Sequence, residues 1–386
     1  MLPSLYSGIS GLRANQQKLN VVANNIANST TTGFKTQSMN FQDMISQTLS
    51  DPSAPSASIG GVNGKQSGLG VKVAGISTDF TTGSVGTTNR NLDFMVDGTG
   101  YFVVGTGSLG APNDDGTPDT NTSDKTGILI DQDTDLTTAD SNILGQKNTD
   151  TTPDLDNEIE TSYTRDGAFF LDTQGNLLTV DGHRVMGYQV TDGADTDPAS
   201  STITYSSDPN EQNKIKFVDA NTSETGGVKV IAGQLVPLSI PNSVTKPDTS
   251  AGAAADATVE VKVKAFSVGK DGYITAQLAD GSTAALGQIA MVSFQNEGGL
   301  VKQGGNLYST SPNSGQAIVR SGKGSSGDGD NSGSYGNLVQ GALEMSNVDL
   351  AQQFTDMIIA TRAFQANGKI ITTDDEILQD LVNLKR

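Results

Sequence analysis

The chain contains few side chains that could perform catalysis. Its 386 residues include one histidine, His183, and no cysteine, which excludes thiolate nucleophiles, disulfides and cysteine-based zinc sites. A Ser/His/Asp triad could use only His183. This histidine follows the turn signal Asp181-Gly182 and precedes an apolar run of the β type, so we expect it in a surface loop. The sequence therefore predicts a protein that is not an enzyme.

Three acidic residues at alternate positions come nearest to a metal-binding motif. Asp131, Asp133 and Asp135 resemble the start of an EF-hand calcium loop. The sixth position is Leu136 where that loop needs glycine, and the twelfth is Asn142 where it needs glutamate. With 43 acidic residues in the chain, any pair of carboxylates has little specificity as a glycosidase acid and base. We therefore expect no EF-hand, metal or other cofactor.

Charge is distributed very unevenly along the chain. The net charge is −19, which argues against nucleic acid or an anionic membrane as a partner. Residues 1–42 contain no acidic residue, whereas residues 105–162 contain 13 acidic residues and two lysines. No apolar run reaches the roughly 18 residues of a membrane span or the roughly 7 to 15 of a cleaved secretory signal. We expect no membrane insertion, and export, if it occurs, by a route without a cleaved signal.

The two ends of the chain have the apolar spacing of coiled-coil helices. Steps of three and four residues define a seam on each end, and two such seams more than 300 residues apart are expected to pair. The first, within a helix expected from Ser4 to Asn28, is Leu2, Leu5, Ile9, Leu12, Gln16, Leu19, Ala23 and Ile26. The second is Leu350, Phe354, Met357, Thr361, Phe364, Gly368, Ile371, Asp375, Leu378 and Val382.

Capping sequences define the C-terminal helix. It is expected to begin at the capping signature from Ser346 to Asp349, with the Asp349 carboxylate reaching back to the cap. A second signature from Thr373 to Glu376 follows Gly368, where the seam weakens. The sequence leaves open whether the helix is continuous through residues 368–373.

The middle of the chain has the alternation and the glycine turns of antiparallel β-structure. The predicted fold class is mixed and mainly β, with terminal α-helices forming a coiled-coil-like domain and two antiparallel β domains between them. The expected domains are 1–32 with 345–386, a helical polymerisation domain; 33–67, a linker with a short helical piece near 39–49; 68–188 with 289–344, an inner β domain; and 189–288, an outer β domain. An acidic insertion, 105–162, is expected in the inner domain as a surface lobe, an exposed loop or a subunit contact.

Sequence motifs at both ends resemble those of the bacterial flagellar rod and hook proteins. They are Ala23-Asn-Asn-Ile-Ala-Asn28 with Thr31-Thr-Gly-Phe-Lys35, and Leu343-Glu-Met-Ser-Asn-Val-Asp-Leu350 with Arg362-Ala-Phe-Gln-Ala-Asn367. Gly287-Gln-Ile-Ala290 and Gly304-Gly-Asn-Leu-Tyr308 look like the hook members in particular. The residues taken to carry the family motif are Asn24, Asn25, Ile26, Ala27, Asn28, Gly33, Phe34, Lys35, Ser346, Asn347, Val348 and Asp349.

The resemblance implies a structural subunit of the flagellar hook, the curved, hollow, extracellular tube that carries motor torque to the filament. It implies export through the flagellar type III apparatus without a cleaved signal. The implied partners are copies of the chain itself, the distal rod, the hook cap and the hook–filament junction proteins. The distal rod protein is the alternative within the family, and it is expected to be shorter and to lack the outer β domain. A secreted acidic adhesin or carbohydrate-binding protein is a further alternative, but it has no use for heptads at both ends.

Physical reasoning from the seams supports polymerisation. A lone two-helix seam leaves apolar flanks exposed in a monomer, so neighbouring subunits are expected to stabilise it. Head-to-tail contacts that do not close generate a helical filament. The residues expected at the polymerisation interface are Leu5, Ile9, Leu12, Leu19, Ile26, Leu350, Phe354, Met357, Phe364, Leu378 and Val382.

Overall fold

The structure, a computed structural model, consists of two compact units. Unit 1 comprises Met1–Gly83 and Ser346–Arg386, and unit 2 comprises Ser84–Met345. The described residues are 2–55, 60–107, 128–131, 143–144, 159–191, 202–206, 211–221, 228–231, 234–247, 258–324 and 331–384. Most of the acidic insertion lies outside them. The predicted fold class, mainly β with a helix at each end, is confirmed.

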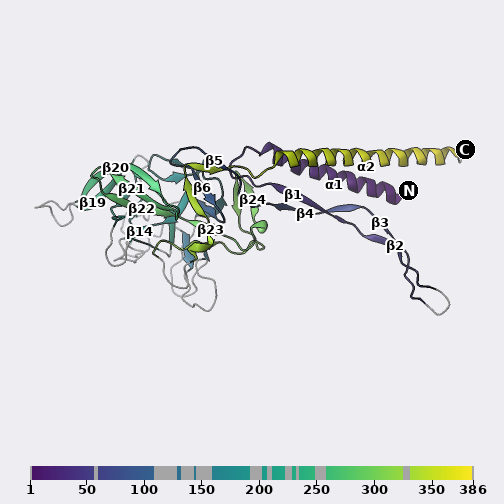
Figure 1. The fold of residues 1–386 in the computed structure, drawn as a ribbon, viewed down its shortest axis with the longest axis horizontal. Helices are drawn as coiled ribbons and strands as arrows, with labels where there is room; N and C mark the ends of the chain where they lie inside the picture. Colours follow the sequence, from purple (N-terminus) through teal and green to yellow (C-terminus); the bar gives the residue numbers. More distant parts are fainter. Residues whose placement is uncertain are drawn as a thin grey trace, which may run out of the picture. The chain divides into compact units, whose positions relative to one another are not determined.

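Unit 1 contains both α-helices, α1 (Leu2–Ala27) and α2 (Leu350–Leu384), which run side by side (Figure 1). The second helix is unbroken through residues 368–373, where the hydroxyls of Thr372 and Thr373 donate back to the carbonyl of Lys369. This bonding gives the two threonine hydroxyls acceptors inside the helix, although β-branched residues have a slightly lower helix propensity. Within the described residues, neither helix is long and apolar enough to cross a membrane.

The cap of α2 is not the residue that the sequence predicted. The Asp349 carboxylate accepts hydrogen bonds from the backbone N–H groups of Ala351 at 2.9 Å and Gln352 at 3.2 Å. Those are the second and third helical positions, so Asp349 is itself the N-cap. The hydroxyl of Ser346 instead accepts from the N–H of Val348 at 3.4 Å. The predicted reach of Asp349 back to a Ser346 cap was therefore wrong.

A two-stranded ribbon follows α1 in unit 1 (Figure 1). Its strands are β1 (Gln37–Asp43), β2 (Ser46–Ser50), β3 (Lys65–Gly68) and β4 (Val71–Thr78), with β1 antiparallel to β4 and β2 antiparallel to β3. The helical piece predicted near residues 39–49 was wrong, because pairing with distant residues decides this segment's conformation. Residues 33–67, expected as a linker, thus contain β1, β2 and part of β3.

Unit 2 consists of short strands. The first and last strands of unit 2 along the chain are β5 (Val85–Thr87), β6 (Phe94–Asp97), β7 (Tyr101–Thr106), β8 (Ile128–Asp131), β9 (Ile143–Leu144), β10 (Glu160–Thr164), β11 (Phe170–Leu171), β12 (Leu177–Leu178), β13 (Arg184–Tyr188), β23 (Met291–Ser293), β24 (Val301–Gly304), β25 (Leu307–Ser309), β26 (Ile318–Val319), β27 (Asn337–Gln340) and β28 (Ala342–Glu344). The strand β7 pairs with β10, β13 and β23.

The remaining strands of unit 2 are β14 to β22, which follow β13 along the chain. They are β14 (Val190–Thr191), β15 (Ile203–Thr204), β16 (Lys214–Lys216), β17 (Lys229–Val230), β18 (Gln234–Pro237), β19 (Ser243–Pro247), β20 (Thr258–Val268), β21 (Tyr273–Leu278) and β22 (Thr283–Ile289). Strands β19 to β22 form an antiparallel meander, and β16 pairs with β19 in parallel. The division of unit 2 into an inner and an outer β domain stays a prediction.

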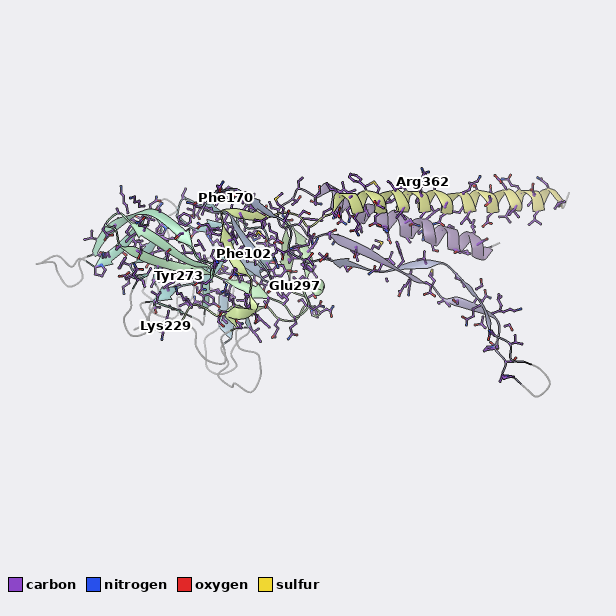
Figure 2. The ribbon with its side chains drawn as sticks, viewed as in Figure 1. Phe102, Phe170, Lys229, Tyr273, Glu297 and Arg362 are labelled. Carbon is purple, nitrogen blue, oxygen red and sulfur yellow. The ribbon has the colours of Figure 1, made fainter. Side chains whose placement is uncertain are left out.

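The core of unit 2 is built on aromatic and β-branched side chains. Phe102 on β7 lies among the strands (Figure 2) and packs edge-on against Phe169, with their ring centroids 5.1 Å apart. Phe94 on β6 lies 5.8 Å from the same ring. On β21, Ile274 and Ala276 are fully buried at alternate positions, which is the period of a strand with one face on a core.

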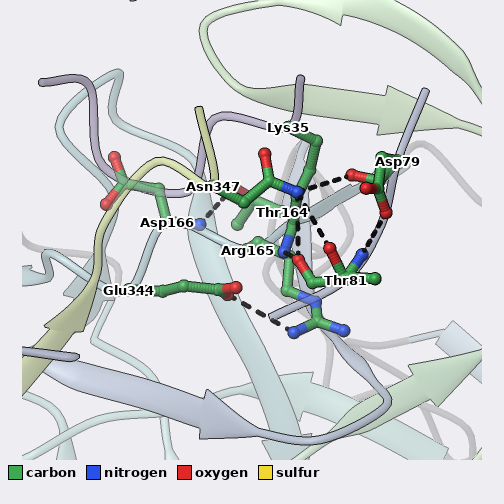
Figure 3. Close-up of polar contacts among 8 residues, drawn as sticks. All are labelled: Lys35, Asp79, Thr81, Thr164, Arg165, Asp166, Glu344 and Asn347. Carbon is green, nitrogen blue, oxygen red and sulfur yellow. Dashed lines mark hydrogen bonds and ion pairs between the residues drawn. The ribbon is translucent and has the colours of Figure 1, made fainter. Parts of the chain in front are cut away.

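A buried ion pair joins Arg165, which directly follows β10, to Glu344 on the distant strand β28. The guanidinium of Arg165 lies 3.3 Å from the Glu344 carboxylate, and 2% and 0% of the two side chains are exposed (Figure 3). The guanidinium also lies 5.0 Å from the centroid of the Tyr101 ring. Burial raises the pKa of the neighbouring Tyr308 to about 12, so this hydroxyl stays neutral at ordinary pH. Because both side chains are buried, solvent and salt screen the attraction between Arg165 and Glu344 very little.

Removing one partner of this pair should strongly destabilise unit 2. We expect Glu344→Ala to lower the free energy of unfolding by about 3 to 5 kcal/mol, because Arg165 stays buried with an uncompensated charge. Urea unfolding followed by tyrosine fluorescence measures this. Lys246→Ala is the control, since it breaks a half-exposed pair with Asp280 at 3.1 Å, worth about 0 to 1 kcal/mol. Equal losses in the two variants would contradict the prediction.

Candidate assembly surface and motif junction

The two terminal helices pair in antiparallel orientation. Near the start of α1 the Ser4 hydroxyl donates to the Asp374 carboxylate at 2.8 Å. Further along, the Lys18 ammonium lies 3.0 Å from the Asp356 carboxylate. Because the partner residue moves back along α2 as the chain advances along α1, the register of the pair is fixed at both of these points.

Small residues line the contact between the helices. Gly8 and Gly11 are buried on α1 and face α2. A methylene added to Gly11 would lie 2.7 Å from the Asn367 amide nitrogen, and one added to Gly8 would lie 3.5 Å from Ile371. The distance between packed helices depends on the side chains at the contact. The two glycines therefore let α2 approach closely.

Of the predicted seam residues, Ile371 lies at this contact, against Gly8, whereas those predicted at the polymerisation interface lie beside it. The five on α1, which are Leu5, Ile9, Leu12, Leu19 and Ile26, are all half-buried. On α2 Met357 is half-buried, and the exposed ones are Leu350, Phe354, Phe364, Leu378 and Val382. The structure thus pairs the two helices, as predicted, but through neighbouring small and polar residues. The contribution of the seam residues to polymerisation stays a prediction.

The end of α2 extends past its partner. It has 35 residues and α1 has 26. With Ser4 opposite Asp374, residues after about 376 have no counterpart on α1. This stretch, called the α2 tail below and comprising residues 377–384, exposes five apolar side chains: Ile377, Leu378, Leu381, Val382 and Leu384.

The motif residue Asn25 forms the first half of a hydrogen-bonded junction. Its side chain is fully buried, donates to the carbonyl of Gln37 at 2.7 Å and accepts from the N–H of the same residue at 3.0 Å. It also donates to the side-chain carbonyl of Gln353 at 3.0 Å. One amide thus joins the end of α1, the start of the ribbon and the first turn of α2.

The motif residues Asn347 and Lys35 form the second half. The Asn347 side chain accepts from the N–H of Thr36 at 2.8 Å and donates to the carbonyl of Asp79 at 2.9 Å. The buried ammonium of Lys35 donates to the carbonyl of Thr81 at 2.8 Å, and Asn347 contacts the same carbonyl at 3.2 Å (Figure 3). These bonds join the segment before α2 to both ends of the ribbon.

The other motif residues have local structural roles. Gly33 is in the left-handed region at a φ of 66°, which glycine adopts without steric cost, and it turns the chain after α1. Phe34 is buried beside it. Asn24 is exposed and its side-chain oxygen accepts from the Asn28 amide at 3.0 Å. The remaining motif residues Ala27 and Val348 are exposed and half-buried respectively, and Ser346 is buried.

Sequence reasoning missed the partners of the junction. Gln353, Gln37 and Thr81 lie outside the recognised motifs or at their edge, and nothing in their spacing distinguishes them from other polar residues. Gln353 differs from the other two, because its carboxamide is buried on a helix. A buried polar side chain there needs a hydrogen-bond partner.

The structure does not assemble a catalytic or metal site around either candidate within the described residues. His183 is half-buried, and its backbone carbonyl accepts from the N–H of Thr179 at 2.8 Å, as in the predicted turn. Asp133 and Asp135 lie outside the described residues. Within the part of the chain that the structure describes, no group of three or more histidine, cysteine or acidic residues could hold a metal ion.

The junction predicts a selective loss of stability at Asn25. We expect Asn25→Ala to lower the free energy of unfolding of unit 1 by about 2 to 3 kcal/mol, since it leaves both backbone groups of Gln37 and the Gln353 amide unpaired in a buried site. Both described α-helices lie in unit 1, so circular dichroism at 222 nm during thermal unfolding reports it. Asn24→Ala, at an exposed neighbour, should change stability by no more than about 0.5 kcal/mol. Similar melting of both variants would refute the structural role of Asn25.

Three family models match the chain. The model described as flagella basal body rod protein matches residues 5–35, and that of the flagellar basal body rod FlgEFG protein C-terminal region matches residues 339–384. A third, the flagellar hook protein FlgE/F/G D1 domain, matches residues 154–276. The first two matches contain all of the motif residues discussed above.

Whole proteins are similar over their full length. The flagellar basal-body rod protein FlgG of Bacillus subtilis is 36% identical over 386 residues, covering 100% of both chains. The flagellar hook protein FlgE of Borreliella burgdorferi is 31% identical over 464 aligned residues, again covering both chains fully. That of Escherichia coli is 28% identical and covers 98% of each.

A solved structure, the Helicobacter pylori flagellar hook protein FlgE2, aligns with 67% of this chain and 100% of its own at 11% identity. Its TM-score is 0.33. The Bacillus subtilis and Borreliella burgdorferi relatives combine more than 30% identity with complete coverage of both chains, and the family models match at both helical ends and in the β region. The chain belongs to the family of flagellar hook and basal-body rod proteins.

Proposed function

We propose that the chain is a structural, non-enzymatic subunit of the flagellar hook, which polymerises through its terminal helices into a hollow, flexible tube that transmits motor torque. The single observation that carries this proposal is the exposed apolar surface on the helix pair of unit 1. Two paired helices leave Phe354, Ile358, Ile359 and Leu378 exposed on α2. Apolar surface of this extent on a folded pair marks a protein contact. In a family of axial flagellar proteins, the partner it fits is another copy of the chain.

The ribbon adds to the exposed apolar surface of unit 1. An isolated pair of strands is marginally stable in water, and here Ile45, just before β2, and Leu49, on β2, are 80% and 68% exposed. Ile76 on β4 is also exposed. Neighbouring subunits that cover the ribbon would therefore stabilise it. Its place in the same unit as the helices extends the proposed assembly surface beyond the seam residues.

A distal rod subunit is the second candidate, and one observation favours it. The Bacillus subtilis relative that is 36% identical is named a rod protein, and the alignment covers all of it. The expectation that a rod protein is shorter does not hold for that relative, so chain length does not separate hook from rod. Polymers of the purified chain, imaged by electron microscopy, test this: curved, bendable tubes support the hook, and straight tubes only would support the rod.

The proposed location is the extracellular part of the flagellum. Export without a cleaved signal, through the flagellar type III apparatus, is part of the proposal. The proposed partners beyond the chain itself are the distal rod, the hook cap and the hook–filament junction proteins. We include no nucleic acid and no membrane among them, consistent with the net charge of −19.

Removing the terminal helices should abolish polymerisation and leave unit 2 folded. A chain lacking residues 1–83 and 346–386 retains the whole of unit 2, with its own core. We expect a monomer with a β-type circular dichroism spectrum and a cooperative thermal transition, since its core does not involve the removed residues. Analytical ultracentrifugation and electron microscopy check both points. Tubes formed by the truncated chain would overturn the proposal.

A charge on an exposed seam residue should block assembly without unfolding the subunit. Phe354 is 51% exposed, so we expect Phe354→Asp to change the free energy of unfolding by no more than about 0.5 kcal/mol. In a subunit contact the same carboxylate is desolvated, which costs several kcal/mol. The variant should therefore fail to pellet as polymer under conditions in which Thr355→Asp, on the neighbouring exposed position, still does. Equal polymerisation of the two variants would remove Phe354 from the interface.

A further inference from the structure

A groove in unit 1 lies between α1 and the ribbon. Its volume is about 440 Å³, which is within the range of sites that bind ligands. Its apolar walls come from Ile9 and Ala14 on α1 and from Leu69, Val71 and Val73 on or before β4. Tyr6 and Met44, which also line it, are 65% and 41% exposed. The groove is therefore an open apolar surface that no described part of the chain covers.

The groove is on a different face of α1 from the contact with α2. Its α1 residues include Tyr6, Arg13 and Gln17, whereas Gly8, Gly11 and Lys18 face α2. With about 100° between successive residues of a helix, the two sets lie on roughly opposite sides. The helix pairing and the filling of the groove can therefore occur together.

The charges that line the groove are positive. Arg13 and Lys72 line it, and no acidic side chain does. Both are exposed. Residues 1–42, which include all of α1, contain no acidic residue at all. An occupant with an apolar stripe and negative charges at its edges would complement this surface in both respects.

The α2 tail has these two properties. Ile377, Leu381 and Leu384 recur at helical spacing, and Leu378 and Val382 continue the same exposed stripe. Residues 374–384 contain four acidic residues and no basic one, before the final two residues of the chain, which are basic. The helical spacing puts Asp375 and Asp380 at the two edges of the stripe. The tail is thus an amphipathic helix end with acidic flanks.

The tail cannot enter the groove of its own chain. The contact of Ser4 with Asp374 sets the register, so residues 377–384 extend past the start of α1. The groove lies along residues 6–17 of α1, in the other direction and on the other side of the helix. Only the tail of a second copy can reach it.

We infer that the groove between α1 and β4 binds the α2 tail of a second copy of this chain, with the apolar stripe on Ile9, Leu69 and Val71 and the tail carboxylates beside Arg13 and Lys72. This inference rests on the proposed function and names the contact for it. Groove and tail are different surfaces of one chain, so the contact is heterologous. Repeated from copy to copy, such a contact builds an open helical array instead of a closed dimer.

Mixed cysteine cross-linking of the full-length chain tests the contact directly. The chain has no cysteine of its own, so one chain carries Gln17→Cys in the groove and the other Leu381→Cys in the tail. Under mild oxidation during assembly, we expect the mixture to give a disulfide-linked dimer at least tenfold above the level from either variant alone. The mixed product can only join different copies. Its absence from tubes that assemble normally would overturn the inference.

Charge exchange tests the electrostatic part. Arg13→Glu with Lys72→Glu, and separately Asp375→Lys with Asp380→Lys, should each raise the concentration needed for assembly at least tenfold. A mixture of the two double variants should assemble as alternating copies. Lys262→Glu with Lys264→Glu, an equal change at two exposed lysines of β20, is the matched control and should assemble normally. If the groove variant fails and no tail variant restores it, a different segment occupies the groove.

These experiments separate the inference from the proposed function. Normal tubes without the mixed cross-link, and without any effect of charge exchange, overturn the inference and leave the proposed function standing. If the unsubstituted chain forms no polymer under any condition, the proposed function fails. The mixed cross-link between soluble chains then decides the inference alone.

Discussion

Close approach of the two chain ends is the constraint on which the rest of unit 1 depends. The helices meet through Gly8 and Gly11, and not through the leucines and phenylalanines of the heptad pattern. This use of small residues has two effects. It lets α2 lie close enough for Asn25 and Gln353 to bond directly, and it leaves the larger apolar side chains on the flanks of the pair. A helix pair packed on leucine would have buried the apolar surface that is proposed for assembly.

Polar bonding, more than apolar packing, holds the junction of helices and ribbon. Asn25, Lys35 and Asn347 come from separate short sequence motifs, and each bonds backbone groups at one end of the ribbon. Buried backbone groups need partners, and a carboxamide supplies a donor and an acceptor together. This explains in physical terms why asparagines dominate the two motifs. An aliphatic residue at these positions would fill the space and leave the backbone unpaired.

The sequence predicted the class of the fold and its two helices, because 3.6-residue periodicity and turn signals are local properties. It did not predict which helix face makes the contact. Heptad patterns rank Leu12 or Phe354 above Gly11, whereas the structure buries the glycine. The ribbon was missed for a related reason: the partners of Met39 and Phe41 are Ile76 and Val73, more than 30 residues away in sequence. Among the site residues, the motifs identified Asn25 and Asn347. Their partners Gln353 and Thr81 could be found only from the folded structure, because hydrogen-bond partners follow no periodic spacing in the sequence.

The chain passes between the two units twice, at residues 83–84 and 345–346. On the unit 1 side Asn347 bonds the carbonyls of Asp79 and Thr81, and on the unit 2 side the N–H of Met345 donates to the carbonyl of Ser84 at 2.9 Å. The two crossing segments are therefore bonded to each other inside unit 1 and again inside unit 2. Opening one segment at the boundary would leave backbone groups of the other without partners, so the two segments should open together and not one at a time.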